Sequence, residues 1–300
     1  MSLRYVLVTP AHNEAADIEK TIKSVISQTV LPKRWVIVSD GSTDDTGEIV
    51  RRYLADHPWI ELIEGPPRKE RHFAAKVEAF NAGYDHVQET QYDVIGNIDG
   101  DVSFDADYME FLLDQFSENP ALGVAGTHYI EGEFHSFRDS YINPQHVNGQ
   151  CQIFRRECFE EIGGYVPNRG GGIDWIAVTT ARMKGWETHS FSERTFRHHR
   201  PMGTAGTSVL GARIHYGKKD YFLGGHPLWQ LFRGTFQMSK KPYVLGGLGL
   251  LFGYFSCWIT RADRPISDEL MQFHRAEQMA RLRGLFSGHR RHPGEGEVSE

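Results

Sequence analysis

The chain has 300 residues, of which 40% are hydrophobic and 24% are charged, a composition typical of a folded protein with a large core. The formal net charge of −6 argues against a general nucleic-acid-binding protein, so no nucleic-acid partner is expected. The three cysteines, Cys151, Cys158 and Cys257, are odd in number and lack the paired spacing of metal sites. They indicate reduced thiols in a cytosolic protein.

Strand and helix patterns alternate along the first part of the chain. Short runs rich in β-branched and aromatic residues predict strands at 4–9, 35–38, 60–63, 94–99 and 123–126. Apolar residues with helical spacing predict helices over 18–26, 49–54, 73–87 and 104–116. This alternation predicts an α/β fold with a mostly parallel sheet covered by helices. Polar clusters follow several strands and are expected to converge on one edge of the sheet.

The strand at 94–99 ends in two acidic residues separated by a glycine, Asp99-Gly100-Asp101. Two carboxylates this close repel each other unless a cation lies between them. Mg²⁺ and Mn²⁺ are the expected cofactors, because they prefer oxygen ligands and leave positions open for substrate phosphates. The alternative is a solvated acidic turn after a strand.

The segment Asp40-Gly41-Ser42-Thr43-Asp44-Asp45-Thr46 follows the second strand. It is not a calcium loop, because its sixth position is Asp45 instead of glycine and its twelfth is Arg51 instead of glutamate. Ser42, Thr43 or Asp44 can cap the next helix by accepting backbone N–H groups. That role is compatible with Asp40 directing its carboxylate at a ligand.

Three motifs carry a resemblance to a known family. Pro10-Ala11-His12-Asn13-Glu14 follows the first strand, the segment at 40–46 follows the second, and Asp99-Gly100-Asp101 comes later. In this order and spacing they resemble the nucleotide-sugar-binding half of family 2 glycosyltransferases, which have the GT-A fold. The resemblance covers roughly the first 200 residues. It implies a Rossmann-like, mostly parallel sheet flanked by helices.

The resemblance assigns a set of donor-binding residues. Ala11 and Glu14 would line a uridine pocket, Asp40 would bind the uracil edge, and Asp101 would bind the metal that bridges the diphosphate. His12 departs from the family, which usually has an aromatic or aliphatic residue there, although a histidine can still stack or hydrogen-bond. Lys76 resembles the family's basic residue near the diphosphate, with a solvated helix face as its alternative. The complete expected nucleotide-sugar set is Pro10, Ala11, His12, Glu14, Asp40, Ser42, Lys76, Asp99 and Gly100.

The acceptor side is expected in the second half. A strand and helix at 150–159 lead into Ile162-Gly163-Gly164-Tyr165, a pattern similar to the family's. The next helix begins with Ile173-Asp174-Trp175, where the family generally has Glu-Asp. By position Asp174 would be the general base that takes the proton of the attacking hydroxyl, and a single base implies inversion. Trp175 would form an acceptor wall. The alternative for Asp174 is a charge favoured by the helix dipole.

Arg197-His198-His199-Arg200 follows this helix. In several relatives a histidine at this place completes the metal shell, so His198 or His199 is a candidate ligand. Adjacent residues of an extended chain point in opposite directions, and only one of the two is therefore expected to bind. Arg200 is assigned to the acceptor side and could meet a phosphate. Gln230-Leu231-Phe232-Arg233-Gly234 partly resembles an acceptor motif of processive synthases, but it lacks the tryptophan, which argues against a processive polymerase. An ordinary helix surface is the alternative for this stretch.

The C-terminal part is apolar and basic. Residues 243–259 form an apolar run shorter than the roughly 20 residues of a spanning helix. A buried hairpin, a monotopic insertion and a short span all fit this run. Membrane association is favoured because residues 231–300 carry ten Lys/Arg against seven Asp/Glu. The expected organisation is a catalytic domain at 1–225 (nucleotide-sugar half 1–103, acceptor half 104–225), a helical membrane-associating region at 226–288 and a disordered tail at 289–300.

These observations together predict an inverting, metal-dependent glycosyltransferase. It would move a sugar from a nucleoside diphosphate, with UDP favoured, to a hydroxyl acceptor such as a polyprenyl-linked glycan in polysaccharide or cell-envelope synthesis. The expected location is cytoplasmic, peripheral at the inner face of the membrane. A non-catalytic sugar-nucleotide-binding scaffold is the alternative. A nucleotidyltransferase is less well supported, because Pro10 to Glu14 contain no glycine-rich, basic loop.

Overall fold

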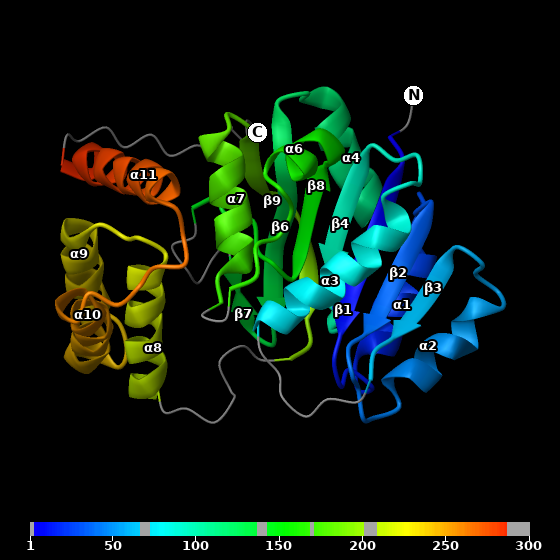
Figure 1. Ribbon diagram of the computed structural model, residues 1–300, viewed down its shortest axis with the longest axis horizontal. Coiled ribbons are helices and arrows are strands. Elements are labelled where there is room, and N and C mark those ends of the chain that lie inside the picture. The colour runs from blue at the N-terminus through cyan, green and yellow to red at the C-terminus, as the bar shows by residue number, and fades with distance from the viewer. Residues whose placement is uncertain (1–2, 67–72, 137–142, 169–170, 201–208, 287–300) are drawn as a thin grey trace, which may run out of the picture. The chain divides into compact units, whose positions relative to one another are not determined.

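The computed structural model describes residues 3–66, 73–136, 143–168, 171–200 and 209–286 (Figure 1). The chain divides into two compact units, residues 1–204 and 205–300. The first helix of the second unit, α8 (Val209–Phe222), packs on α10 (Tyr243–Ile259). The division therefore comes earlier in the chain than the boundary at 225 that the sequence suggested. The segment at 289–300, expected to be a disordered tail, lies outside the described residues.

A single mixed sheet forms the centre of the first unit. Its strand order is β3-β2-β1-β4-β8-β6-β9-β5, with β7 paired to β6. β1, β2, β3 and β4 are parallel to one another, β8 is antiparallel to both β4 and β6, and β9 runs parallel to β6. The strands are β1 (Tyr5–Ala11), β2 (Arg34–Ser39), β3 (Ile60–Glu64), β4 (Val94–Ile98), β5 (Val102–Phe104), β6 (Leu122–Glu131), β7 (Phe134–His135), β8 (Cys151–Arg155) and β9 (Glu187–His198).

Helices cover both faces of this sheet because the strands are apolar on both sides. In β1, Tyr5 and Leu7 join one buried cluster while Val6 and Val8 join the other, as the two-residue period of a strand requires. The first cluster includes side chains of α1 (Ile18–Ile26), α2 (Thr46–Leu54) and α4 (Tyr108–Glu118). The second includes side chains of α3 (Phe73–Val87), α6 (Arg156–Glu161) and α7 (Ile173–Met183).

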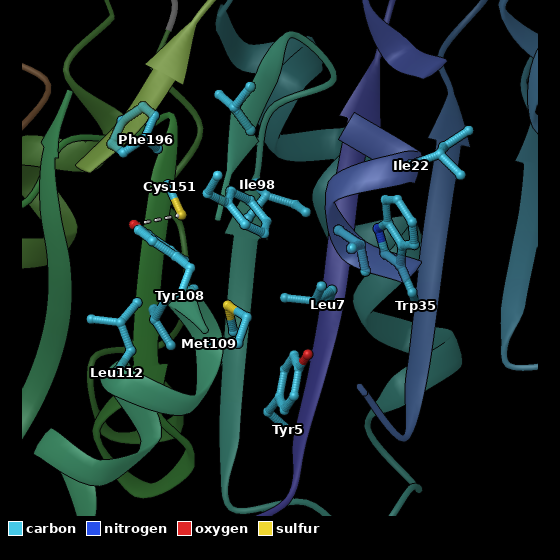
Figure 2. Close-up of a cluster of buried hydrophobic side chains, with 14 of the residues drawn as sticks. Tyr5, Leu7, Ile22, Trp35, Ile98, Tyr108, Met109, Leu112, Cys151 and Phe196 are labelled. Carbon is cyan, nitrogen blue, oxygen red and sulfur yellow. Dashed lines mark hydrogen bonds between the residues drawn. The ribbon is translucent and has the colours of Figure 1, made fainter. Parts of the chain in front are cut away.

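Figure 2 shows part of the first cluster, in which the side chains of Tyr108 and Cys151 point toward each other. The buried hydroxyl of Tyr108 donates a hydrogen bond to Sγ of Cys151 over 3.4 Å, and the indole of Trp35 donates to Oγ1 of Thr9 over 2.9 Å. Burial raises the pKa of the Cys151 thiol to about 12. Cys151, Cys158 and Cys257 are all buried and free, so they act as packing groups.

The topology brings several strand ends to one edge of the sheet. β1, β2 and β4 are parallel, and two antiparallel pairings through β8 give β6 the same direction as β4. β9 follows β6 in parallel. The carboxyl ends of β1, β2, β4, β6 and β9 therefore lie at the same edge, where ligands bind in open α/β sheets. Polar residues leave the sheet at each of these ends.

The second unit is helical. It contains α8, α9 (Pro227–Met238), α10 and α11 (Asp268–Phe286), and α10 packs on both α8 and α9. A small buried cluster of Tyr221, Tyr254 and Cys257 lies between α8 and α10. Within the residues that the structure describes, none of the helices is long and apolar enough to cross a membrane.

Candidate active site

The loops that follow β1 and β2 are joined by reciprocal hydrogen bonds. Asn13 adopts a left-handed conformation with φ of 55°, which asparagine tolerates better than most residues. Its backbone N–H donates to Oγ of Ser42 over 3.1 Å, and its side-chain carbonyl accepts from the Thr43 N–H over 2.8 Å. The Nδ1 of His12 donates to the Asp40 carbonyl over 2.6 Å. Ser42 and His12 thus connect the loop after β1 to the loop after β2.

Asp44 and Thr46 complete this connection. The backbone N–H groups of Glu14 and Ala15 donate to Thr46 Oγ1 over 2.8 Å and to Asp44 Oδ2 over 3.0 Å. Asp44 also accepts from the Thr46 N–H over 3.1 Å, but the N-cap of α2 (Thr46–Leu54) is Asp45 and its side chain makes no capping hydrogen bond, so the expected cap by Ser42, Thr43 or Asp44 is not formed. Burial opposes ionisation of Asp44, but hydrogen bonds from Thr46 and Ala15 outweigh it and lower its pKa.

The loops place three of the expected donor residues at the ends of neighbouring strands. Pro10 and Ala11 are the last residues of β1, and Ala11 is buried. Asp40 directly follows β2, and its backbone N–H donates to the Ala11 carbonyl over 2.8 Å. Asp40 and Ala11 therefore lie together at the edge where β1 and β2 end, as a shared base pocket requires.

Asp99 and Lys76 form an ion pair at the end of β4. Nζ of Lys76, on α3, lies 2.5 Å from Oδ1 of Asp99. Burial raises the pKa of Asp99, while the charge of Lys76 acts in the opposite direction. The next residue is Gly100, where a β-carbon would lie 3.1 Å from Cδ1 of Ile18 and 3.2 Å from Cγ of Glu14. Gly100 lets the acidic turn approach the Glu14 side chain closely.

The carboxylate of Asp101 is buried beside two cationic groups. Its Oδ2 lies 3.5 Å from Nε2 of His198 and 3.7 Å from Nε of Arg200. Its buried Oδ1 has no hydrogen-bond partner within the described residues. Burial favours the neutral acid, but the hydrogen bond and charge of His198 and the charge of Arg200 lower the pKa of Asp101. A buried, ionised oxygen without a partner is costly unless a ligand satisfies it.

The two adjacent histidines face different partners. His198 contacts Asp101 on one side and donates from Nδ1 to Glu131 Oε2 over 3.0 Å on the other. Burial would lower the pKa of His198, but these carboxylates raise it to about 9. The imidazole Nε2 of His199 instead hydrogen-bonds Ser103 Oγ over 2.8 Å. The geometry thus places His198, and not His199, against the acidic pair.

Arg200 pairs with the buried carboxylate of Glu14 and also approaches Asp101. The structure therefore brings Arg200, which the sequence assigned to the acceptor side, into contact with Glu14 and Asp101, which the sequence assigned to the donor side. The guanidinium bridges the loop after β1 and the turn after β4. Because its charge is permanent, it can meet a phosphate without any change of protonation.

Asp174 lies in the first turn of α7, after Gly172 in a left-handed conformation with φ of 79°. A β-carbon on Gly149 would lie 2.7 Å from Cβ of Asp174, so the loop before β8 touches this side chain. The carbonyl of Gly149 accepts from Asn97, and that of Gln150 accepts from the Asp99 N–H over 2.8 Å. The same loop thus borders both Asp99 and Asp174. Trp175, next on α7, is half-buried.

Tyr165 and Gln152 form a buried hydrogen-bonded pair beside Asp174. The hydroxyl of Tyr165 donates to Gln152 Oε1 over 2.6 Å. Burial, together with the negative charges of Asp174 and Asp99, raises the pKa of Tyr165 well above its ordinary value. Tyr165 therefore stays neutral close to both acids.

Sequence reasoning did not identify several residues of this site. Glu131 ends β6 next to His198, Ser103 binds His199, and Asn97 binds the Gly149 loop. Glu131 could not have been found, because nothing in the sequence shows that β6 and β9 lie side by side. Thr46 belonged to a recognised motif, but its role in holding Glu14 depends on the contact between two loops.

The residues that could hold a metal ion are Asp101 and His198. Within the described ranges, no group of three or more His, Cys, Asp or Glu side chains is arranged to bind one. The pair fits a divalent cation once His198 has lost its Nε2 proton, because Asp101 Oδ1 is buried and without a partner in the described part of the chain. A hard cation that takes its remaining ligands from water and phosphates needs only one or two protein groups.

The family model for "Glycosyl transferase family 2" matches residues 6–167. The chain belongs to this family. The match includes the loops after β1 and β2 and the acidic turn after β4, and it ends before α7 and β9.

Polysaccharide synthases of two staphylococcal species are similar to part of the chain. A poly-β-1,6-N-acetyl-D-glucosamine synthase of Staphylococcus epidermidis is 28% identical over 117 residues, and that of Staphylococcus aureus strain COL is 27% identical over 113 residues. Each alignment covers 38% of this chain and 25% of the relative, so the chain aligns with about a quarter of these proteins.

Solved structures share the GT-A fold. The mannosyltransferase PcManGT from Pyrobaculum calidifontis, in complex with GDP-Man and Mn²⁺, has a TM-score of 0.58 at 19% identity, covering 95% of this chain and 81% of that one. S. aureus TarS 1–349 in complex with UDP-GlcNAc has a TM-score of 0.53 at 11% identity, covering 86% and 73%. At these identities the likeness establishes the fold, which confirms the expected fold class.

Proposed function

We propose that the chain is a metal-dependent, inverting glycosyltransferase that moves a sugar from a nucleoside diphosphate to a hydroxyl acceptor. The observation that carries the proposal is the buried Oδ1 of Asp101, which lacks a partner in the described structure while Lys76, His198 and Arg200 surround the acidic turn. A cation and an anionic diphosphate together satisfy this arrangement of charges.

The donor end of the site would bind the diphosphate. Lys76 and Arg200 are anchored by Asp99 and Glu14, which orients both cations toward the acidic turn. Asp101 and His198 would hold Mn²⁺ or Mg²⁺, and the bound cation supplies stabilisation of the negative charge that develops on the leaving diphosphate. Lys76 and Arg200 add to that stabilisation.

The nucleotide is proposed to be UDP, bound where β1 and β2 end. Asp40 and Ala11 meet at this edge through the Asp40 N–H and the Ala11 carbonyl. The solved relatives hold either GDP-Man or UDP-GlcNAc, so the base preference is a question for direct titration.

Asp174 is proposed as the general base. Its place in the first turn of α7 and the Gly149 loop that connects it to Asp99 support this role. The carboxylate would accept the proton of the attacking hydroxyl as that oxygen forms its bond to the anomeric carbon. A single displacement of this kind inverts the sugar configuration, and Trp175 would help to wall the acceptor.

The acceptor is proposed to be lipid-linked, with the protein acting peripherally at the cytoplasmic face of a membrane in polysaccharide or cell-envelope synthesis. Support comes from the similarity to poly-β-1,6-N-acetyl-D-glucosamine synthases and from the apolar, basic second unit. A non-catalytic binding protein is the second candidate, because Ile173 stands where the family generally has glutamate.

Calorimetric titration of UDP and GDP, with and without Mn²⁺, tests the donor site. Asp101→Asn should lose metal-dependent binding, while Asp105→Asn, an exposed acid on the same segment, should bind like the wild type. For a 10 μM site, 1 mM ligand should stabilise the fold by about 2.7 kcal/mol. Binding of neither nucleotide under any metal condition would refute the donor site. Binding without any metal-dependent, Asp174-dependent turnover would favour the non-catalytic candidate.

A further inference from the structure

Helix α10 exposes large apolar side chains along its whole length. Leu245, Leu248, Phe252 and Ile259 have exposed fractions of 61%, 50%, 64% and 73%. They recur at intervals of three, four and seven residues, so they share one face of the helix. We call these four residues the α10 stripe. A contiguous apolar surface of this kind usually marks an interaction site.

The opposite side of α10 is packed through glycines. A β-carbon on Gly253 would overlap the carbonyl of Ile214 in α8, and one on Gly247 would overlap the carbonyl of Gly234 in α9. A β-carbon on Gly249 would lie 2.8 Å from Cδ1 of Leu210. The smallest residues of α10 therefore lie inside the unit and many of its largest lie outside. Small residues at helix contacts with large apolar residues outside are typical of helices packed in lipid.

The charges near the stripe are mainly basic, although Asp220 pairs with Arg233 and Asp263 lies two residues after Arg261. From Tyr221 to Ala262 the sequence contains no aspartate or glutamate, but it contains Arg233, Lys240, Lys241 and Arg261. Lys240 and Lys241 lie just before Pro242, the N-cap of α10, and Arg261 follows the helix by two residues. The stripe thus has basic groups at both ends, which is the charge pattern that complements anionic lipid headgroups.

The geometry also sets the orientation of the helix. α10 has 17 residues, which corresponds to a length of about 26 Å and is too short for a typical span. One side of the helix is occupied by α8 and α9, and the other side is apolar from the first turn to the last. A helix of this kind is suited to lie in the plane of the interface.

We propose that the α10 stripe docks on an anionic lipid bilayer, with α10 parallel to the surface and Lys240, Lys241 and Arg261 at the level of the phosphates. The proposal rests on the membrane association included in the proposed function and names its surface, but it does not depend on the transfer reaction. Vesicle binding and nucleotide binding can therefore fail separately.

The experiment is co-sedimentation of the full chain with vesicles of phosphatidylcholine alone or with 30% phosphatidylglycerol. Wild type should sediment mainly with the anionic vesicles. Lys240→Gln/Lys241→Gln should weaken that partitioning roughly 25-fold, at about fivefold per lost charge. Leu248→Gln/Phe252→Gln should weaken it about a hundredfold by removing apolar area. Lys33→Gln/Arg52→Gln, exposed charges of the first unit, should bind like the wild type.

A second measurement needs no destabilising variant. Trp258, at the end of α10, is half-exposed, and lipids brominated on their acyl chains should quench its fluorescence. Trp258→Phe should remove the quenched component. Wild type that stays in the supernatant with anionic vesicles, a stripe variant that sediments fully, or sedimentation without quenching would each overturn the proposal. A dimer that the stripe substitutions dissociate, without vesicle binding, would identify a second copy as the occupant and also overturn it.

Discussion

Gly149→Ala offers a test of Asp174 that leaves the carboxylate in place. The new β-carbon would lie 2.7 Å from Cβ, 3.1 Å from Cγ and 3.3 Å from Oδ2 of Asp174. Real β-carbon contacts are essentially never shorter than 3.0 Å and ordinary van der Waals contact begins at 3.4 Å, so the two β-carbons must separate by about 0.3 Å and by about 0.7 Å to reach ordinary contact. The Gly149 φ angle is not in the left-handed region, so the substitution acts through this contact and not through backbone strain.

A displacement of this size matters only if Asp174 acts on the reacting atoms. A misplacement of about 1 Å can cost a hundredfold in rate, so kcat should fall roughly ten- to hundredfold. The assay is UDP release from the accepted sugar nucleotide, with the affinity for UDP measured separately by calorimetry. Affinity for UDP should change little, because the clash involves Asp174 and not the groups around Asp101.

The control is Gly284→Ala on α11, where a β-carbon would have open space. In an Asp174→Asn background, Gly149→Ala should cause little further loss, because two changes that act on one group are not additive. Turnover within twofold of wild type for Gly149→Ala would refute Asp174 as the base. A matching loss of UDP affinity would instead indicate that the loop shapes the donor site.

Three further predictions concern protonation and packing. Mn²⁺ affinity should rise with pH up to about pH 9, by as much as about tenfold per pH unit, because the folded, metal-free protein holds the His198 proton up to that pH. His198→Gln should flatten this dependence in a calorimetric titration. An unchanged slope would show that His198 is not involved. Tyr108→Phe removes a buried donor to Cys151 and should lower the free energy of unfolding by about 1–3 kcal/mol in a urea titration, without changing UDP affinity; a loss of UDP binding would contradict its purely structural role. The β-carbon of Gly253→Ala would overlap the Ile214 carbonyl, which cannot move aside like a side chain, so the substitution should destabilise the second unit by about 1–3 kcal/mol. Hydrogen exchange of α8 and α10 should accelerate. Unchanged protection would show that the two helices are not packed through this glycine.

The first half of the sheet could be predicted from sequence because its signals are local. Each of β1 to β4 is a short apolar run followed by a polar loop, and β-branched residues such as Val36 and Ile37 favour strands on their own. β9 was not predicted. Glu187–His198 has an irregular mixture of buried and exposed residues, and it forms a strand because β6 and β5 flank it. That pairing is a tertiary effect.

The same distinction separates the predicted and unpredicted parts of the site. The motifs at 10–14, 40–46 and 99–101 were found because each follows a strand directly, and the structure brings all three to one sheet edge. The choice between His198 and His199 was left open, because it depends on which side of β9 faces Asp101. The catalytic and ligand-binding roles of these residues stay predictions until the titrations are made.

The pairing of β9 with β6 also has a consequence for folding. His198 comes from β9, Glu131 from β6 and Asp101 from the turn after β4, so their ion pairs join segments far apart in the chain. A nascent chain that has emerged only as far as residue 167 already contains the family motifs and both acids of the turn, but it lacks His198 and Arg200. During synthesis, the like charges of Asp99 and Asp101 therefore gain these two cationic neighbours only when β9 adds to the sheet. Completion of the proposed donor site would then coincide with completion of the domain, and we expect an incomplete chain to bind UDP poorly.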